Sequence, residues 1–155
     1  MCGFVGAFFD DAVQRPDPAV VAAMRDLITH RGPDMAGIQV GDGYGLGFRR
    51  LSILDLRPEA NQPMRAPDAP VWLVFNGEIY NHKAIRNRLE KLGHTFKTTC
   101  DTEVLLHAYL QWGQACVDHL EGMYAFAVRD ERDGTTVIAR DPVGIKPLYL
   151  ARMPT

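Results

Sequence analysis

The sequence lacks the features that mark membrane and nucleic-acid-binding proteins. It has no apolar run near the roughly 18 residues that a membrane span needs. It has no basic excess, because 17 Lys and Arg stand against 19 Asp and Glu, a formal net charge of −2 at pH 7. The first residues do not form a basic stretch followed by a cleavable apolar segment, so no signal peptide is expected. We therefore expect a cytoplasmic protein with no nucleic-acid and no membrane partner.

Cysteine is also scarce, with three residues at positions 2, 100 and 116. An odd count in a chain of this length argues against a disulfide framework and favours a reducing compartment. Neither Cys116 with His119 nor Cys100 with His107 has the spacing of a zinc site, so no metal site is expected. Cys100 and Cys116 are interpreted as buried structural thiols.

The chain of 155 residues fits one domain, residues 1–155, and shows no repeat or linker. The glycines never complete a Gly-x-Gly-x-x-Gly pattern, which excludes a Rossmann interpretation. Strands come first, helices in the middle and strands again at the end. This order indicates an α+β fold and not a doubly wound parallel sheet.

Periodicity and turn residues place the individual elements. The expected strands cover 2–9, 38–40, 44–48, 71–75, 123–129, 135–140 and 147–151. The expected helices follow caps at Asp17, Asn81 and Asp101 and end near 29, 92 and 112, with a short helix at 114–120. Residues 57–70 hold four prolines and are expected to form an irregular surface loop.

Cys2 directly follows the initiator methionine, and its side chain is small enough for Met1 to be trimmed. Cys2 would then carry a free α-amine beside its thiol. An α-amine titrates near about 8 and can take the thiol proton, which activates the thiol as a nucleophile. Taken alone, Cys2 is better interpreted as an incidental small residue that permits methionine removal.

Asn76-Gly77 follows an apolar strand and is expected to form a tight turn. A side-chain NH₂ and a backbone N–H at one point suit a developing oxyanion, where one donor contributes about 2.7–4 kcal/mol. The same dipeptide is also the commonest hairpin turn.

Arg50, Glu78 and Asp101 could bind an amino acid. Arginine binds an α-carboxylate through a bidentate fork, and a pair of carboxylates can hold an α-ammonium group. The alternatives are a solvated strand end for Arg50, a surface charge for Glu78 and a helix cap for Asp101.

Together these residues resemble a known family. The chain is similar to class II glutamine amidotransferase domains, and most to the glutaminase domain of glutamine-hydrolysing asparagine synthetases. The motifs that carry the resemblance, in chain order, are Met1-Cys2-Gly3, His30-Arg31-Gly32-Pro33-Asp34, Arg50-Leu51-Ser52-Ile53, Asn76-Gly77-Glu78-Ile79-Tyr80-Asn81, Asp101-Thr102-Glu103, Gly122 to Ala127 and Arg140 to Tyr149. The resemblance implies the N-terminal nucleophile hydrolase fold, a four-layer αββα sandwich of mainly antiparallel sheets.

The resemblance also implies hydrolysis of glutamine to glutamate and ammonia through a γ-glutamyl thioester. The implied catalytic residues are Cys2, with its α-amine as the base, and Asn76 and Gly77 as the oxyanion hole. The implied substrate-binding residues are Arg50 for the α-carboxylate, Glu78 and Asp101 for the α-amine, and a backbone group near Ile53. The loop with Arg31 and Asp34 lies near the active site, towards the ammonia exit, in related domains. We favour a structural ion pair with indirect effects on catalysis for these two residues.

Asparagine synthetases continue into an ATP-pyrophosphatase domain with a Ser-Gly-Gly-x-Asp-Ser phosphate loop, which this sequence lacks. The glutaminase step is expected to need no cofactor, and ATP and Mg²⁺ only the missing synthetase domain. A synthetase domain or subunit is the expected partner that receives ammonia, and the chain is expected to be an excised or C-terminally truncated domain, or else an unusual short protein. Homodimerisation of the full-length protein is left open. The alternatives are a different ammonia acceptor, or a domain that binds glutamine or a partner without turnover.

Overall fold

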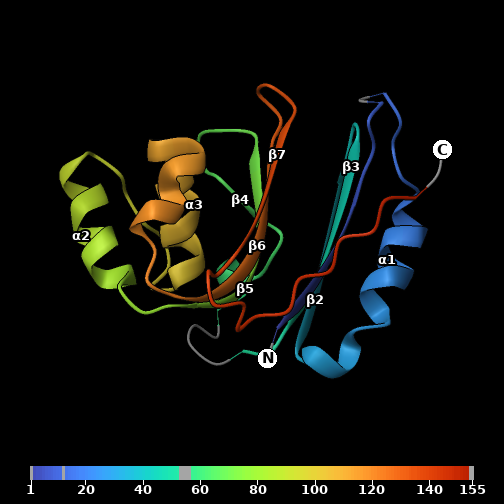
Figure 1. Cartoon of the computed structure of the whole chain (residues 1–155), viewed down its shortest axis with the longest axis horizontal. Coiled ribbons are helices and arrows are strands. Elements are labelled where there is room, and N and C mark those ends of the chain that lie inside the picture. Colours follow the sequence, from blue (N-terminus) through green and yellow to red (C-terminus); the bar gives the residue numbers. More distant parts are fainter. Residues whose placement is uncertain (1, 12, 53–56, 154–155) are drawn as a thin grey trace.

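The computed structural model describes residues 2–11, 13–52 and 57–153. It has two antiparallel β-sheets that face each other, with helices on both outer sides. Figure 1 shows the layers side by side: α2 and α3, then the sheet with β5, then the sheet with β3, then α1. The expected four-layer αββα sandwich is confirmed.

The first sheet has the strand order β1-β3-β2. Its strands are β1 (Gly3–Phe8), β2 (Met35–Gly41) and β3 (Tyr44–Arg50). β2 and β3 form the expected hairpin, in which Gly43 supplies a positive φ of 78° at the turn. β1 pairs with the other edge of β3, so that Gly3 lies opposite Arg49.

The second sheet has the strand order β4-β5-β6-β7. Its strands are β4 (Met64–Arg65), β5 (Val71–Ile79), β6 (Gly122–Asp130) and β7 (Thr135–Arg140). β4 covers the edge of β5 only opposite Trp72 and Leu73. Among the strands of the described residues, none neighbours the rest of that edge of β5.

In the described part of the chain, three α-helices pack on the outer faces. They are α1 (Pro18–Asp26), α2 (His82–Lys91) and α3 (Asp101–Trp112). α1 begins with the expected cap, because the Asp17 carboxylate accepts the Ala19 N–H at 2.8 Å. Short 3₁₀ turns occur at Thr29–Arg31, Pro58–Ala60 and Gly113–His119.

Alternation along β5 divides the core into two layers. Leu73 and Phe75 face α3 and belong to the larger apolar cluster, together with Phe126 of β6. Val74 faces the other sheet and packs with Phe48 in a smaller cluster between the sheets. Successive residues of a strand point to opposite faces, so the even-numbered residues of β5 face the first sheet.

Polar contacts between the sheets fix which ends lie together. The Tyr44 hydroxyl donates to Glu131 at 2.5 Å, and Arg129 donates to the Asp42 carbonyl at 3.1 Å. These residues lie at the start of β3 and at the end of β6, which is paired with the start of β5. The ends of β3 and β5 therefore lie together at the opposite end of the sandwich, where β1 begins.

Several local expectations were wrong. The helix expected to end near Thr29 ends at Asp26 and continues as a separate 3₁₀ turn. The segment 57–70 is not a surface loop, because Gln62 and Ala66 are buried beside the edge of β5. No strand forms over 147–151, where the described chain is irregular and largely exposed. The local sequence pattern could not predict these features, because each depends on contacts with another part of the chain.

Candidate active site

Cys2 lies at the end of the sandwich where β1 begins. It immediately precedes β1, and its half-buried side chain packs with that of Phe4 against the cluster between the two sheets. Its thiol contacts the Leu51 carbonyl oxygen at 3.6 Å. The thiol is therefore held between the sheets and is not a loose end of the chain.

The loop before β2 contacts the backbone on both sides of the thiol. The Arg31 guanidinium donates to the Cys2 carbonyl at 3.5 Å, and the Asp34 carboxylate accepts the Ser52 N–H at 2.7 Å. The peptide group between Leu51 and Ser52 therefore contacts the thiol through its carbonyl oxygen and Asp34 through its N–H. Among the residues described here, Arg31 and Asp34 form no ion pair with each other. Each side chain contacts a backbone group instead of the other, and the indirect effect of the two residues on catalysis stays a prediction.

Arg50 is the last residue of β3, and its side chain is buried. Its guanidinium donates to the Arg57 carbonyl at 3.0 Å and contacts the Met35 sulfur at 3.5 Å. Gly3 pairs with Arg49, so Arg50 lies at the same end of the sheet as Cys2. The structure thus brings Arg50 close to the thiol along the first sheet.

Asn76 and Gly77 do not form a turn, contrary to the sequence-based expectation. Both lie inside β5, opposite Ala125 and Tyr124 of β6. An Asn-Gly pair is a turn signal only in isolation, and here the pairing with β6 outweighs it. A β-carbon at Gly77 would stand 2.3 Å from the Met123 carbonyl oxygen, so this close packing requires glycine.

The alternation of β5 gives Asn76 and Gly77 different directions. Asn76 is buried, and its side chain is on the same face of β5 as that of Val74, which faces the first sheet and its Cys2. The Gly77 N–H points in the same direction as the N–H groups of Phe75 and Ile79, which point away from β6 towards the open edge of β5. One side-chain amide and one backbone N–H are therefore available from adjacent residues.

Side chains occupy that open edge on both sides of Gly77. Gln62 accepts the Phe75 N–H at 2.6 Å, and Asp101 accepts the Ile79 N–H at 2.9 Å. Within the described part of the chain, the Gly77 N–H between them has no partner. It is therefore a backbone donor at a fixed position, as an oxyanion hole requires.

Asp101 and Glu78 differ in environment although they lie close together. Glu78 is exposed, whereas Asp101 is 4% exposed and bonds the peptide that follows Glu78. Burial raises the pKa of Asp101, opposed by the Ile79 N–H and the nearby His82. Asp101 is not the helix cap that the sequence suggested, since the cap position is Cys100 and Asp101 begins α3.

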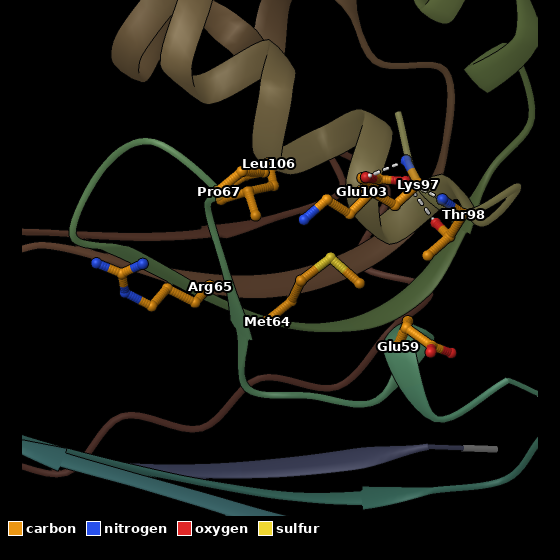
Figure 2. Close-up of a pocket in the computed structure, with 8 residues that line it drawn as sticks. All are labelled: Glu59, Met64, Arg65, Pro67, Lys97, Thr98, Glu103 and Leu106. Atoms are coloured by element: carbon orange, nitrogen blue, oxygen red, sulfur yellow. Dashed lines mark hydrogen bonds between the residues drawn. The ribbon is translucent and has the colours of Figure 1, made fainter. Parts of the chain in front are cut away.

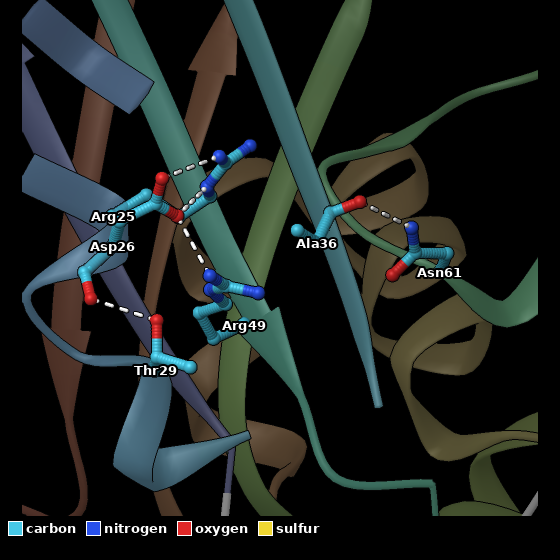
Figure 3. A network of polar contacts seen from close by, with 6 residues as sticks. All are labelled: Arg25, Asp26, Thr29, Ala36, Arg49 and Asn61. Carbon is cyan, nitrogen blue, oxygen red and sulfur yellow. Dashed lines mark hydrogen bonds and ion pairs between the residues drawn. The ribbon is translucent and has the colours of Figure 1, made fainter. Parts of the chain in front are cut away.

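The aspartate at the end of α1 bonds this helix to β3. Asp26 accepts from Arg25 and from Arg49, both at 2.8 Å, and Figure 3 shows the three side chains together. The bond from Arg25, with a smaller contribution from Arg49, lowers the pKa of Asp26. Figure 3 also shows Asn61 donating to the Ala36 carbonyl of β2, at 3.2 Å.

Two hollows among the described residues are lined by none of the expected site residues. One of about 100 Å³ lies between the segment 59–67 and the first turns of α3. In Figure 2, Glu103 points back to the chain at Lys97 and Thr98, whose N–H groups it accepts at 2.8 and 2.7 Å. Glu103 thus has a local structural role. The second hollow, of about 280 Å³, is lined by His94 and His107.

Some expectations are not addressed by this geometry, and some features were missed. Ile53 lies outside the described residues. No cluster of three or more His, Cys, Asp or Glu side chains that could hold a metal appears in the described part of the chain, and the absence of a metal stays a prediction. No helix there is long and apolar enough to cross a membrane. Sequence reasoning missed Gln62 and the Leu51 carbonyl, because neither residue type signals a site without its partner across the fold.

A family model described as a glutamine amidotransferase domain matches residues 1–155. Among curated proteins, asparagine synthetase [glutamine-hydrolyzing] 1 of Bacillus subtilis (strain 168) is 43% identical over 151 residues, which cover 96% of this chain and 24% of that protein. Asparagine synthetase [glutamine-hydrolyzing] 3 of Arabidopsis thaliana is 39% identical over 151 residues, covering 97% of this chain and 25% of that protein. The chain thus spans about a quarter of the length of these relatives.

Solved structures share the fold. Glutamine phosphoribosylpyrophosphate amidotransferase from B. subtilis, complexed with ADP and GMP, matches with a TM-score of 0.74 at 22% identity over 95% of this chain and 38% of that chain. A structure described as the allosteric regulatory enzyme of purine biosynthesis matches with a TM-score of 0.57 at 28% identity, covering 70% of this chain and 26% of that chain. The likeness to the first structure supports the expected N-terminal nucleophile hydrolase fold.

Proposed function

Because the chain belongs to the family of glutamine amidotransferase domains, we propose that it hydrolyses glutamine to glutamate and ammonia. The observation that carries this proposal is the meeting of two sheets at one end of the sandwich. The first sheet brings Cys2 and Arg50 to that end, and the second brings Asn76 and the free Gly77 N–H. A nucleophile, an oxyanion site and charged groups for an amino acid are thus close together.

The proposed chemistry uses Cys2 as an N-terminal nucleophile once Met1 has been removed. The α-amine takes the thiol proton, and the sulfur attacks the side-chain carbonyl carbon of glutamine. Asn76 and the Gly77 N–H stabilise the oxyanion of the tetrahedral intermediate. The α-ammonium group of Cys2 gives its proton to the amide nitrogen of the intermediate, which then collapses to a γ-glutamyl thioester and releases ammonia. Water then hydrolyses the thioester to glutamate and restores the thiol.

The α-amino acid end of glutamine is assigned to the charged residues. Arg50 binds the α-carboxylate, and Glu78 with Asp101 binds the α-ammonium group. The raised pKa of Asp101 supports this assignment, since an ammonium group favours the charged carboxylate that burial disfavours. A backbone group near Ile53 stays part of the proposal.

The acceptor of ammonia is proposed to be an asparagine synthetase-type domain or subunit. The support is the identity of 43% and 39% to proteins named glutamine-hydrolysing asparagine synthetases, of which this chain covers only about a quarter. ATP and Mg²⁺ would serve that acceptor and not the glutaminase step. A cytoplasmic location is proposed because the mechanism needs a reduced Cys2, and all three cysteines are free thiols. A homodimer of the full-length protein also stays a proposal.

Covalent labelling tests the proposal directly. A glutamine analogue with an electrophilic carbon in place of the amide should add once to the purified chain. Intact mass should show the loss of Met1 and one adduct, located by peptide mapping at Cys2. Cys100 and Cys116 are buried and serve as internal controls, and Cys2→Ala should stay unlabelled.

Activity decides between an enzyme and a binding domain. The wild-type chain should release glutamate and ammonia in equal amounts, and Cys2→Ala should release neither. A wild-type chain that has lost Met1 but is neither labelled nor active would contradict the proposed function.

A further inference from the structure

Gln62 contacts the strand that carries the oxyanion donors. It is 5% exposed, and its side-chain oxygen accepts the Phe75 N–H at 2.6 Å. Its side-chain nitrogen donates to the Thr102 hydroxyl at 3.4 Å, on the first turn of α3. Both ends of this buried amide are therefore used, and they join β5 to the helix that carries Asp101.

The backbone of Gln62 is held by the other sheet. A β-carbon at Gly37 of β2 would stand 2.0 Å from the Gln62 carbonyl oxygen, so the two chains are in close contact there. The neighbouring Asn61 donates to the Ala36 carbonyl of β2 at 3.2 Å (Figure 3). Gln62 is thus fixed to the sheet that carries Cys2, while its side chain bonds the strand that carries Asn76 and Gly77.

The bond from the Phe75 N–H to Gln62 lies on the same edge of β5 as the Gly77 N–H. The N–H groups of Phe75, Gly77 and Ile79 point to the same open edge, where β4 no longer covers the strand. Gln62 holds the first and Asp101 holds the third. A strand edge fixed on both sides of one donor keeps that donor from turning towards water or a neighbouring carbonyl.

We propose that Gln62 is a positioning residue. Its backbone is held against the first sheet, and its side chain holds the Phe75 N–H, so that the Gly77 N–H on the same strand stays oriented towards the oxyanion. This inference rests on the proposed glutaminase function. Gln62 touches neither substrate nor thiol in this role. It acts on the transition state, because the oxyanion exists only after Cys2 has attacked.

The test compares Gln62→Met with the wild-type full chain. Methionine keeps the length of the side chain but removes the oxygen that accepts the Phe75 N–H. Removal of a whole oxyanion donor costs about 10²–10³ in kcat, so misorientation of one donor should lower kcat about tenfold or more. KM for glutamine should stay within about threefold, because the α-amino acid contacts are unchanged.

Two further measurements separate positioning from a general structural role. Glutamate γ-semialdehyde adds the Cys2 thiol to form a thiohemiacetal, in which the S–C bond forms and the thiol proton passes to the aldehyde oxygen. Its inhibition constant should rise in Gln62→Met by about the same factor as kcat falls. Alkylation of Cys2 by iodoacetamide needs no oxyanion site and should stay within about twofold of wild type.

Conservative variants complete the design. Gln62→Glu keeps an oxygen for the Phe75 N–H and should recover most of kcat. Tyr109→Phe removes a buried hydrogen bond to Asp130, 3.3 Å long and far from the site, and should leave kcat and the aldehyde affinity unchanged. If Gln62→Met does not fold, Thr102→Val decides, because loss of its hydroxyl should produce the same pattern at about threefold.

The inference would be overturned if the folded Gln62→Met variant, or Thr102→Val where it replaces that variant, kept the wild-type kcat and aldehyde affinity. Wild-type activity would in that case leave the proposed function intact. An equal loss of alkylation, hydrolysis and aldehyde binding would also overturn it, since such a loss indicates general damage. A wild-type chain without glutaminase activity would instead remove the proposed function itself.

Discussion

At the scale of single residues, the arrangement changes the weight of each candidate. Cys2 could have been an incidental small residue, yet its side chain packs between the sheets and contacts the Leu51 carbonyl. Asn76 could have been part of an exposed turn, yet it is buried within β5. Asp101 is buried and bonds a backbone N–H beside Glu78. Their shared end of the sandwich supports the proposal that these separate residues belong to one site.

Replacement of Arg50 by alanine should weaken glutamine binding. Hydrogen bonds to charged groups contribute about 1.5–3 kcal/mol each, so loss of the contacts to the α-carboxylate should raise KM by about 10- to 100-fold. Steady-state kinetics with glutamine measures this effect. The neighbouring Arg49→Ala provides the matched control, because Arg49 bonds Asp26 at the end of α1 and should leave KM nearly unchanged. An unaltered KM in Arg50→Ala would remove Arg50 from the substrate site.

At the scale of elements, the loop before β2 is fixed by close packing at Gly32. Its φ of −157° is extended backbone that any residue can adopt, so glycine is not needed there for its conformation. The reason is space, because a β-carbon would stand 2.5 Å from the carbonyl carbon of Arg50 and 2.6 Å from the carbonyl oxygen of Arg49. The loop that carries Arg31 and Asp34 therefore lies directly on the end of β3.

Gly32→Ala should accordingly destabilise the protein by about 1–3 kcal/mol, as overpacking of a rigid contact does. Glutaminase activity should fall as well, because the loop also bonds the Cys2 carbonyl and the Ser52 N–H. Denaturant unfolding measures the first effect. Gly6→Ala is the control, since its new β-carbon would crowd the ring of the exposed Phe8, at 2.8 Å, which can move, and would meet Leu46 at an ordinary contact distance of 3.7 Å. Equal stability of the two variants would show that the loop is not held by this contact.

Most elements followed from local pattern, and the exceptions have a common cause. The β2–β3 hairpin, α2 and α3 are marked by a turn dipeptide or by helical spacing, which act within a few residues. β5 was expected to stop at Phe75, because the sequence cannot show that β6 pairs with Asn76 to Ile79. Gln62 was assigned to a surface loop for the same reason. The residues most relevant to the site are thus those whose partners lie farthest away in the chain.

At the scale of the whole molecule, polar links between the sheets occur at both ends of the sandwich. At the site, Asn61 bonds Ala36 of β2 while its neighbour Gln62 bonds Phe75 of β5, and at the far end Tyr44 bonds Glu131. The apolar layer between the sheets is small, with Phe48 and Val74 among its members. The relative position of the two sheets, on which the meeting of Cys2 and Asn76 depends, therefore rests in part on buried polar groups.

Buried tyrosines and cysteines should make the fold less stable as the pH rises into the alkaline range. Burial is the main cause that raises the pKa of Tyr44, of Tyr109 to about 12 and of Cys116 to about 11. Burial also raises the pKa of Tyr124 and Cys100. In the unfolded chain these groups titrate near their ordinary values of 9.0 for the thiols and 10.0 for the phenols. Above those values the unfolded chain binds fewer protons than the folded chain, so the free energy of unfolding must fall as pH rises.

The fall should begin near pH 9 and steepen above pH 10. Each group that is ionised only in the unfolded state adds about 1.4 kcal/mol per pH unit to the slope. Denaturant unfolding between pH 8 and pH 11 measures the slope, and Tyr109→Phe should reduce it by the share of one group above pH 10. Tyr109 lies on α3, away from the meeting of the sheets, so the change should leave KM for glutamine unaltered at neutral pH. A stability that stays constant up to pH 11 would contradict this prediction, since folding would then not raise the pKa of these phenols and thiols.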